Sequence, residues 1–368
     1  MLLQADAATA ASLLDSFNPV APDRGVGSRA ASRMQLVLIL PGLLEAQASG
    51  ASPRRGPALA ELLARGGPPS RDADGLDAAI ASRYRVERQA DWPLAAIRAA
   101  SLGLPAGDAY WLAADPVTLV VGRDDVALSG IVDDLSRGEA DALASTLNAH
   151  FVDDGVVFVA PRPDSLFARL AKPPRLTTHP PAATTDEPLR LRLPQGADAP
   201  TWRRWQSEIQ MLLHEHPVNV EREKSSRPPV NGLWFSTGGV LPSRTSPDPP
   251  VRTFADMGIA VALAAHIGSP ARPVPAQLGG ALGHTDGAGQ TIVVALATDI
   301  ALPELERSWA APARDALVSG QLTEVSVLAR DAGDSVSWRA LRPRLWQRIA
   351  GRVRRRDLAA EIAAALRA

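Results

Sequence analysis

The chain has 368 residues, 46% of them hydrophobic, and 39 basic residues almost balance 40 acidic ones. This apolar content excludes a wholly disordered chain, and a net charge of -1 gives no general attraction to nucleic acid or anionic lipid. The absence of cysteine excludes disulfides, thiolate nucleophiles and cysteine-ligated metals. No apolar run approaches the ~20 residues that a bilayer-spanning helix needs. We therefore expect a cytoplasmic protein that binds neither nucleic acid nor membrane.

The first 33 residues differ in composition from the rest of the chain. They lack the basic segment and apolar run of a secretory signal, and they are rich in Pro, Gly, Ser and Arg from Asn18 to Arg33. An apolar run then extends from Met34 to Leu40 and ends at Pro41-Gly42. Such a run is typical of a first parallel strand that is buried on both faces. Residues 1–33 are therefore predicted to be a disordered leader, or Met34 is the true start.

Strand-like and helical segments alternate along the rest of the chain, which predicts an α/β fold. Helices are expected at 57–65, 92–102, 136–151, 201–216 and 304–318, and strands at 34–40, 111–121 (broken by Asp115-Pro116), 155–160, 189–193, 230–235, 291–296 and 325–328. The helix at 136–151 has a clear start, because Ser136 and Glu139 form the pattern of a capping box. The apolar run at 257–265 fits either a helix or a strand.

The densest group of polar residues lies at 208–223. His214 and His216 are two residues apart, so on a continuous helix they point in different directions and cannot share one metal. Pro217 ends the helix near there, which leaves open that the two histidines converge in a turn. Helix capping and structural hydrogen bonds are the alternative interpretation of the pair.

Three other segments are weaker candidates for function. The strand at 230–235 runs into Gly238-Gly239, where a turn could present backbone N–H groups to an anion or could be a plain turn. A short loop contains His284 and Asp286. The arginines from Arg352 to Arg356 precede an Ala-rich helix, which we expect to be a solvated surface helix that could dock on a partner.

The stretch from Leu189 to Ser243, with its pattern HPVN…R…N…W…G…P, resembles the RpfE-type regulatory proteins of proteobacteria. It is more distantly similar to the inserted domain of archaeal-type cofactor-independent phosphoglycerate mutases. The upstream order of strand (WLAADPVTL), helix (GEADALASTLNAHF) and strand (GVVFVAP) is also similar to these mutases. The resemblance to the RpfE-type family covers Met34 to about Trp346, and the resemblance to the mutases covers about Trp111 to Pro275.

The resemblance implies an α/β fold in which a shortened alkaline-phosphatase-like sheet carries an inserted α+β domain. It also implies a division of the chain into four parts. These are a leader at 1–33, a phosphatase-like core at 34–110 and 276–345, an inserted mutase-like domain at 111–275, and a C-terminal helical tail at 346–368.

The mutases that the chain resembles use two divalent metals to activate a serine nucleophile and to neutralise the transferring phosphoryl group. Their first metal ligand is the Asp of an Asp-Gly pair that ends the first strand, where this chain has Pro41-Gly42. Other ligands come from an Asp-His pair late in the chain, but no such pair occurs here and no histidine follows His284. We therefore expect no catalytic residue, no metal site and no cofactor.

In the mutases, the inserted domain binds the non-reacting part of the substrate, and the resemblance implies a similar role here. The expected binding residues are His216, Asn219, Arg222, Asn231, Gly238 and Gly239. An arginine fork binds a carboxylate or phosphate through two hydrogen bonds, so the predicted ligand is a small phosphorylated or carboxylated metabolite. In the alternative interpretation Arg222 pairs with Glu215 or Glu221. Asn231 then only caps a strand.

Three classes of function are compatible with these observations. The favoured one is a non-catalytic regulatory or metabolite-sensing protein, because the motif of the inserted domain is retained while the expected metal ligands are missing. The second is a metal-dependent phosphoryl transferase with relocated ligands from His214, His216, His284 and nearby carboxylates. The third is a structural protein-interaction partner that uses its eight tryptophans for packing and docking.

Overall fold

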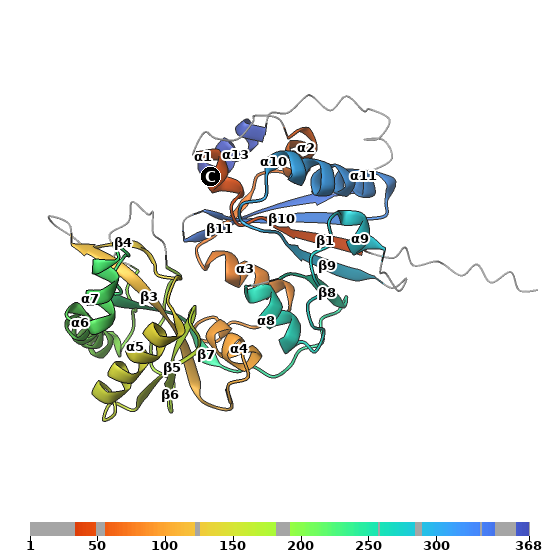
Figure 1. Ribbon diagram of the computed structural model, residues 1–368. Helices are drawn as coiled ribbons and strands as arrows, with labels where there is room; N and C mark the ends of the chain where they lie inside the picture. The colour runs from red at the N-terminus through yellow and green to blue at the C-terminus, as the bar shows by residue number, and fades with distance from the viewer. Residues whose placement is uncertain are drawn as a thin grey trace, which may run out of the picture.

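The computed structural model describes residues 34–48, 56–121, 126–181, 192–256, 258–283, 289–331, 333–342 and 358–367. The predicted leader, the loop with His284 and Asp286, and the arginines from Arg352 to Arg356 lie outside these residues. The described parts form two β-sheets with helices packed on them (Figure 1). The predicted α/β class is confirmed. None of the described helices is long and apolar enough to cross a bilayer.

Eleven strands belong to the two sheets. They are β1 (Met34–Ile39), β2 (Ser70–Asp72), β3 (Tyr110–Val121), β4 (Val126–Ile131), β5 (Val156–Arg162), β6 (Ser165–Leu170), β7 (Gly232–Val240), β8 (Val251–Phe254), β9 (Gln290–Ala295), β10 (Glu324–Asp331) and β11 (Asp334–Leu341). The helices are α1 (Leu43–Ala48), α2 (Pro57–Arg65), α3 (Gly75–Arg83), α4 (Leu94–Ser101), α5 (Arg137–His150), α6 (Ala199–His214), α7 (Pro217–Lys224), α8 (Ile259–His266), α9 (Leu278–Leu282), α10 (Leu302–Glu304), the π-helix η2 (Leu305–Ala310), α11 (Ala311–Ser319) and α13 (Leu358–Arg367).

The first sheet has the strand order β2-β11-β10-β1-β9-β8. Its central strand β1 is parallel to both neighbours, β9 and β10, while β11 and β2 form an antiparallel edge. Leu36 and Leu38 pack in a cluster with α2 and α11, whereas Val37 and Ile39 pack in a cluster with α3 and α8. Both faces of β1 are therefore buried, as the apolar run predicts. Figure 1 shows these helices on opposite sides of the sheet.

The second sheet contains β3 to β7 and is built around the long strand β3. β3 pairs with β6, β7 and β4, and it runs without a break through Asp115 and Pro116. The predicted interruption there is wrong, because Pro116 stays in register with β7 opposite Leu233 and its carbonyl accepts a hydrogen bond from the N–H of Val132. On one face, β3 packs against α5 and α6 around a tryptophan-rich core.

Helix α4 lies between the two sheets. Leu94 and Ile97 belong to the cluster that covers one face of the first sheet. The alanines of α4 instead contact Trp111 and Phe167 on the outer face of the second sheet. These alanines are Ala95, Ala96 and Ala99. One helix therefore packs in the cores of both sheets.

The chain leaves the second sheet after β7 and returns to the first sheet as β8, which is parallel to β9. The segment predicted as an inserted domain, 111–275, thus includes β8 and α8, which pack with the first sheet. The division of the chain into domains stays a prediction. β8, which begins at Val251, already pairs with a strand of the first sheet.

Two local predictions differ from the structure, and one open choice between helix and strand is decided. The helix expected at 201–216 is followed at once by a second helix, α7, because Pro217 occupies a first helical position, where its missing N–H costs nothing. The run at 257–265 contains the helix α8. The prediction of a solvated C-terminal helix is wrong for α13, because Leu358 and Ile362 are buried in the core cluster that also contains α2.

Candidate functional site

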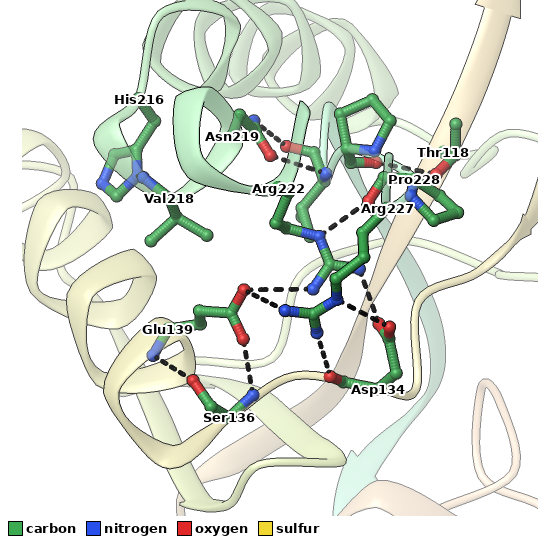
Figure 2. A network of polar contacts seen from close by, with 12 residues as sticks. Thr118, Asp134, Ser136, Glu139, His216, Val218, Asn219, Arg222, Arg227 and Pro228 are labelled. Atoms are coloured by element: carbon green, nitrogen blue, oxygen red, sulfur yellow. Dashed lines mark hydrogen bonds and ion pairs between the residues drawn. The ribbon is translucent and has the colours of Figure 1, made fainter. Parts of the chain in front are cut away.

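The structure places the six predicted binding residues in two separate regions. His216, Asn219 and Arg222 lie on or at the start of α7 (Figure 2). Asn231 lies just before β7. Gly238 and Gly239 lie near the other end of β7. Eight residues of extended chain separate Asn231 from Gly239, which is roughly 26 Å. The six residues therefore do not surround one ligand.

Arg222 is the centre of a buried charge network. Its side chain has no exposed surface. Its Nη2 donates to Oδ1 of Asp134 at 2.5 Å, its Nη1 to Oε1 of Glu139 at 3.1 Å, and its Nε to the carbonyl of Pro228 at 2.7 Å. Arg227 donates to the same two carboxylates, so that two guanidinium groups face two carboxylates. Figure 2 shows all four side chains converging beside the start of α5.

The pKa values of both carboxyl groups reflect this arrangement. Hydrogen bonds from Arg222 and then Arg227 hold the pKa of Asp134 below its ordinary value. Burial acts to raise the pKa of Glu139, but hydrogen bonds from Ser136 and Arg222 outweigh burial and leave the pKa below its ordinary value. The positive charges are thus matched within the protein, and an anionic ligand would have to displace a carboxylate from Arg222.

The alternative interpretation was right that Arg222 forms ion pairs, but it named the wrong partners. Neither Glu215 nor Glu221 forms an ion pair with Arg222; Glu221 pairs with Lys224 on the surface. The two carboxylates come from the start of α5 and the loop before it, 83 and 88 residues away in sequence. Residue spacing within α7 therefore does not identify the ion-pair partners of Arg222.

The side-chain amides of the two asparagines also form hydrogen bonds with the protein backbone. Asn219 donates from Nδ2 to the carbonyls of Leu213 at 2.6 Å and Val230 at 2.7 Å, and its Oδ1 accepts the N–H of Val230 at 2.8 Å. Asn231 binds both main-chain groups of Leu119, accepting at 2.7 Å and donating at 2.8 Å. This agrees with the strand-capping role in the alternative interpretation. A role in ligand binding stays a prediction for both residues.

His216 caps the start of α7. Its Nδ1 accepts the N–H of Val218 at 3.2 Å, and its Nε2 lies 2.9 Å from Oγ1 of Thr146. Because Nδ1 accepts, the neutral ring carries its proton on Nε2, which donates to Thr146. Burial lowers the pKa of His216 and favours this neutral form. His214 is exposed at the last residue of α6, so the two histidines have separate environments.

The predicted glycine turn is wrong, because Gly238 and Gly239 lie within strand β7. A Cβ atom on Gly238 would lie 2.3 Å from the hydroxyl of Tyr110, and one on Gly239 would lie 2.5 Å from Cβ of Pro93. The two glycines thus allow β7 to pack closely against β3 and against the start of α4. Close packing accounts for their small size, and a role in ligand binding stays a prediction for both glycines.

A pocket of about 180 Å³ lies at the carboxyl ends of β1 and β9. Its lining consists of Leu40, Gly42, Leu43, Ala297, Thr298, Asp299, Ile300, Ala301, Leu302 and Leu305. In open α/β sheets, ligands bind outside the carboxyl ends of the parallel strands. A Cβ on Gly42 would lie 2.1 Å from the carbonyl oxygen of Thr298, so glycine permits the loops after β1 and β9 to meet. Sequence reasoning did not predict this contact.

The residues of this pocket do not fit the two-metal site that the mutase resemblance implies. Asp299 is the only ionisable residue in the lining, and Pro41 offers no ligand atom at the end of β1. Within the described ranges no group of three His, Cys, Asp or Glu side chains is arranged to hold a metal. A divalent metal requires several such donors together. No catalytic step through a metal follows from this lining.

Comparison with known proteins gives a distant structural similarity. No family model matches the chain, and no curated protein matches it. The cofactor-independent phosphoglycerate mutase of Thermoplasma acidophilum is 14% identical, with a TM-score of 0.43, over 90% of this chain and 94% of that chain. The PH0037 protein of Pyrococcus horikoshii is 16% identical, with a TM-score of 0.44, over 90% of this chain and 92% of that chain. Similarity at this level carries no conclusion about activity.

Substitution of Arg222 tests whether its network is structural. We expect Arg222→Ala to lower the free energy of unfolding by about 3 kcal/mol or more, because it removes the buried member of an ion-pair network. Arg227→Ala is the matched control, since Arg227 contacts the same carboxylates from a side chain that is 36% exposed. We expect its loss to be about 1 kcal/mol or less. Urea denaturation measures both values, and equal losses would contradict a special role for the buried arginine.

Acidification tests the neutral cap at His216. The unfolded state takes up a proton near the ordinary pKa of 6.5, whereas the folded state resists protonation because its pKa is lowered. The free energy of unfolding therefore falls as the pH drops below about 6.5 towards the lowered pKa of the folded state. His216→Asn keeps a capping side chain without a titrating group, so we expect a shallower fall.

His214→Asn is the matched control, because it makes the same substitution at an exposed histidine two residues away. His266, whose pKa is also lowered by burial, is present in all three proteins and contributes equally. Chemical denaturation between pH 5 and about 7.5 gives the profiles. Identical profiles for wild type and His216→Asn would show that the cap does not titrate in this range.

Proposed function

We propose that this chain is a non-catalytic, metabolite-sensing regulatory protein that binds its ligand at the carboxyl ends of β1 and β9. The observation that carries the proposal is the character of the pocket there. It has the location expected for a ligand site in a parallel sheet, yet only one ionisable residue lines it. Hydrolytic or phosphoryl-transfer chemistry needs a nucleophile together with a base or a group that stabilises negative charge. This lining supports binding without turnover.

The lining also indicates the chemistry of the ligand. Leu40, Leu43 and Leu305 are buried and supply apolar walls. Thr298 and Asp299 are exposed at the rim and supply the polar groups. A carboxylate at the rim favours a ligand with an amine or hydroxyl group and opposes a phosphate. We therefore propose a small ligand with an apolar body and a cationic or donor group, in place of the phosphorylated or carboxylated metabolite expected from the sequence.

The regulatory part of the proposal is supported by the resemblance of Leu189 to Ser243 to the RpfE-type proteins. A cytoplasmic location belongs to the same proposal. The alternative of a phosphoryl transferase has no support among the described side chains, because His214 and His216 lie apart from the pocket at the ends of β1 and β9.

Thermal shift and calorimetry with cyclohexylamine and cyclohexanol test this pocket. We expect wild type to bind the amine more tightly than the alcohol, because an ammonium group can form an ion pair with the side chain of Asp299. Asp299→Asn should remove this difference while leaving the affinity for the alcohol unchanged. Asp256→Asn is the matched control, since Asp256 follows the neighbouring strand β8 and lies outside the lining. Equal affinities of wild type for both probes would contradict the assigned role of the rim carboxylate.

The absence of catalysis is tested on the same protein. We expect no turnover of 2-phosphoglycerate or 4-nitrophenyl phosphate in the presence of magnesium, manganese or zinc. A rate near ~1 s⁻¹ that survives extensive purification lies in the usual range of enzymes and would overturn the non-catalytic assignment. This result is independent of the binding experiment, because a protein can bind either probe whether or not it turns over a phosphate ester.

A further inference from the structure

A second pocket, of about 250 Å³, lies between α6 and the strands β3 and β7. It shares no lining residue with the pocket at the carboxyl ends of β1 and β9. Its lining consists of Val117, Leu119, Leu193, Arg203, Gln206, Ser207, Gln210, Gly232, Leu233 and Trp234. None of the six binding residues expected from the sequence lines this pocket.

The floor of the pocket is apolar and rigidly held. Val117 and Trp234 are buried together with Leu128 in a small cluster, and Leu119 packs against them. The indole Nε1 of Trp234 donates to the carbonyl of His179 at 2.8 Å. This hydrogen bond fixes the orientation of the ring, because the only donor of the indole is already used. The apolar side of the pocket is therefore preformed.

The opposite wall is polar and comes from one side of α6. Arg203, Gln206, Ser207 and Gln210 are spaced by three and four residues, so they line the same stripe of the helix. The neighbouring stripe of α6 is buried in the core through its tryptophans. The side chains of the polar stripe thus stand at the edge of the apolar floor.

Arg203 differs from the next residue in its contacts. Arg204 pairs with Asp154 at 3.3 Å and with Glu208 at 3.4 Å. Arg203, in contrast, has no ion pair and no side-chain hydrogen bond to any of the residues that the structure describes. Arg203 is the only charged residue in the lining, and no other residue within the described ranges binds its guanidinium. This contrasts with Arg222, whose donors are bound within the protein.

We propose that this pocket binds a small monocarboxylate with a compact apolar body. The carboxylate pairs with the guanidinium of Arg203, whose planar fork matches it. The amide side chains of Gln206 and Gln210 supply further donors at the same wall, and the apolar body lies against Leu119 and Leu193, which are only partly buried. One arginine without a second cation suits a single negative charge, so the geometry favours a carboxylate over a phosphate dianion.

Calorimetric titration with phenylacetate and its uncharged analogue phenylacetamide tests the site. We expect wild type to bind phenylacetate at least about tenfold more tightly than the amide, because a charge-assisted hydrogen bond is worth about 1.5 kcal/mol or more. Arg203→Ala should weaken phenylacetate binding by a similar factor and leave amide binding unchanged. Hexanoate and hexanamide repeat the comparison with an aliphatic body.

Arg204→Ala is the matched control, because it removes an arginine from the adjacent position of the same helix and outside the lining. We expect it to keep the affinity of wild type for phenylacetate. Since Arg203 is exposed, its replacement is expected to leave the fold intact, which circular dichroism checks. The proposal is overturned if wild type binds neither phenylacetate nor hexanoate at about 10 mM. It is also overturned if Arg203→Ala and Arg204→Ala weaken phenylacetate binding equally.

Discussion

The arrangement of the two sheets depends on the close packing of helix α4 between them. The alanine face of α4 brings its backbone near Trp111 and Phe167, while Leu94 and Ile97 fill the core on the other side. Arg98 adds a contact over the ring of Phe167, with 5.4 Å between its Cζ and the ring centroid. Because a larger residue at an alanine position would have to displace one of these cores, α4 fixes the second sheet relative to the first.

Elements with a strong local pattern could be predicted from the sequence. The buried strand β1 and the helices α2 and α5 are examples, and the capping box of Ser136 and Glu139 is present as expected. The strands β2, β4, β6, β8 and β11 were missed because they are short, carry exposed or polar positions, or follow a tight hairpin. Their pairing depends on partners elsewhere in the chain. Gly238 and Gly239 were misjudged for the same reason, since the atoms that require glycine belong to Tyr110 and Pro93.

The polar residues around α7 could be recognised from the sequence, but their partners could not. Arg222 was identified by its chemistry, yet its role depends on carboxylates that the fold brings from a distant helix. The two pockets could not be predicted for the same reason, because residues that are distant in sequence line each of them. Gly42 lies beside Thr298 in one pocket, and Arg203 and Trp234 line the other. The sequence does not distinguish Arg222, which is paired, from Arg203, which has no ion pair with any described residue. The contacts in the structure distinguish them.

The hydrogen bonds between Asn231 and Leu119 have a consequence for the solubility of the second sheet. A strand end with unpaired N–H and C=O groups is a template on which another chain can pair, and this is a common route to aggregation. At this end of β3 the side-chain amide of Asn231 stands in for the next residue of a neighbouring strand and occupies both groups of Leu119. The residue that first suggested ligand binding thus closes an edge against the addition of a foreign strand.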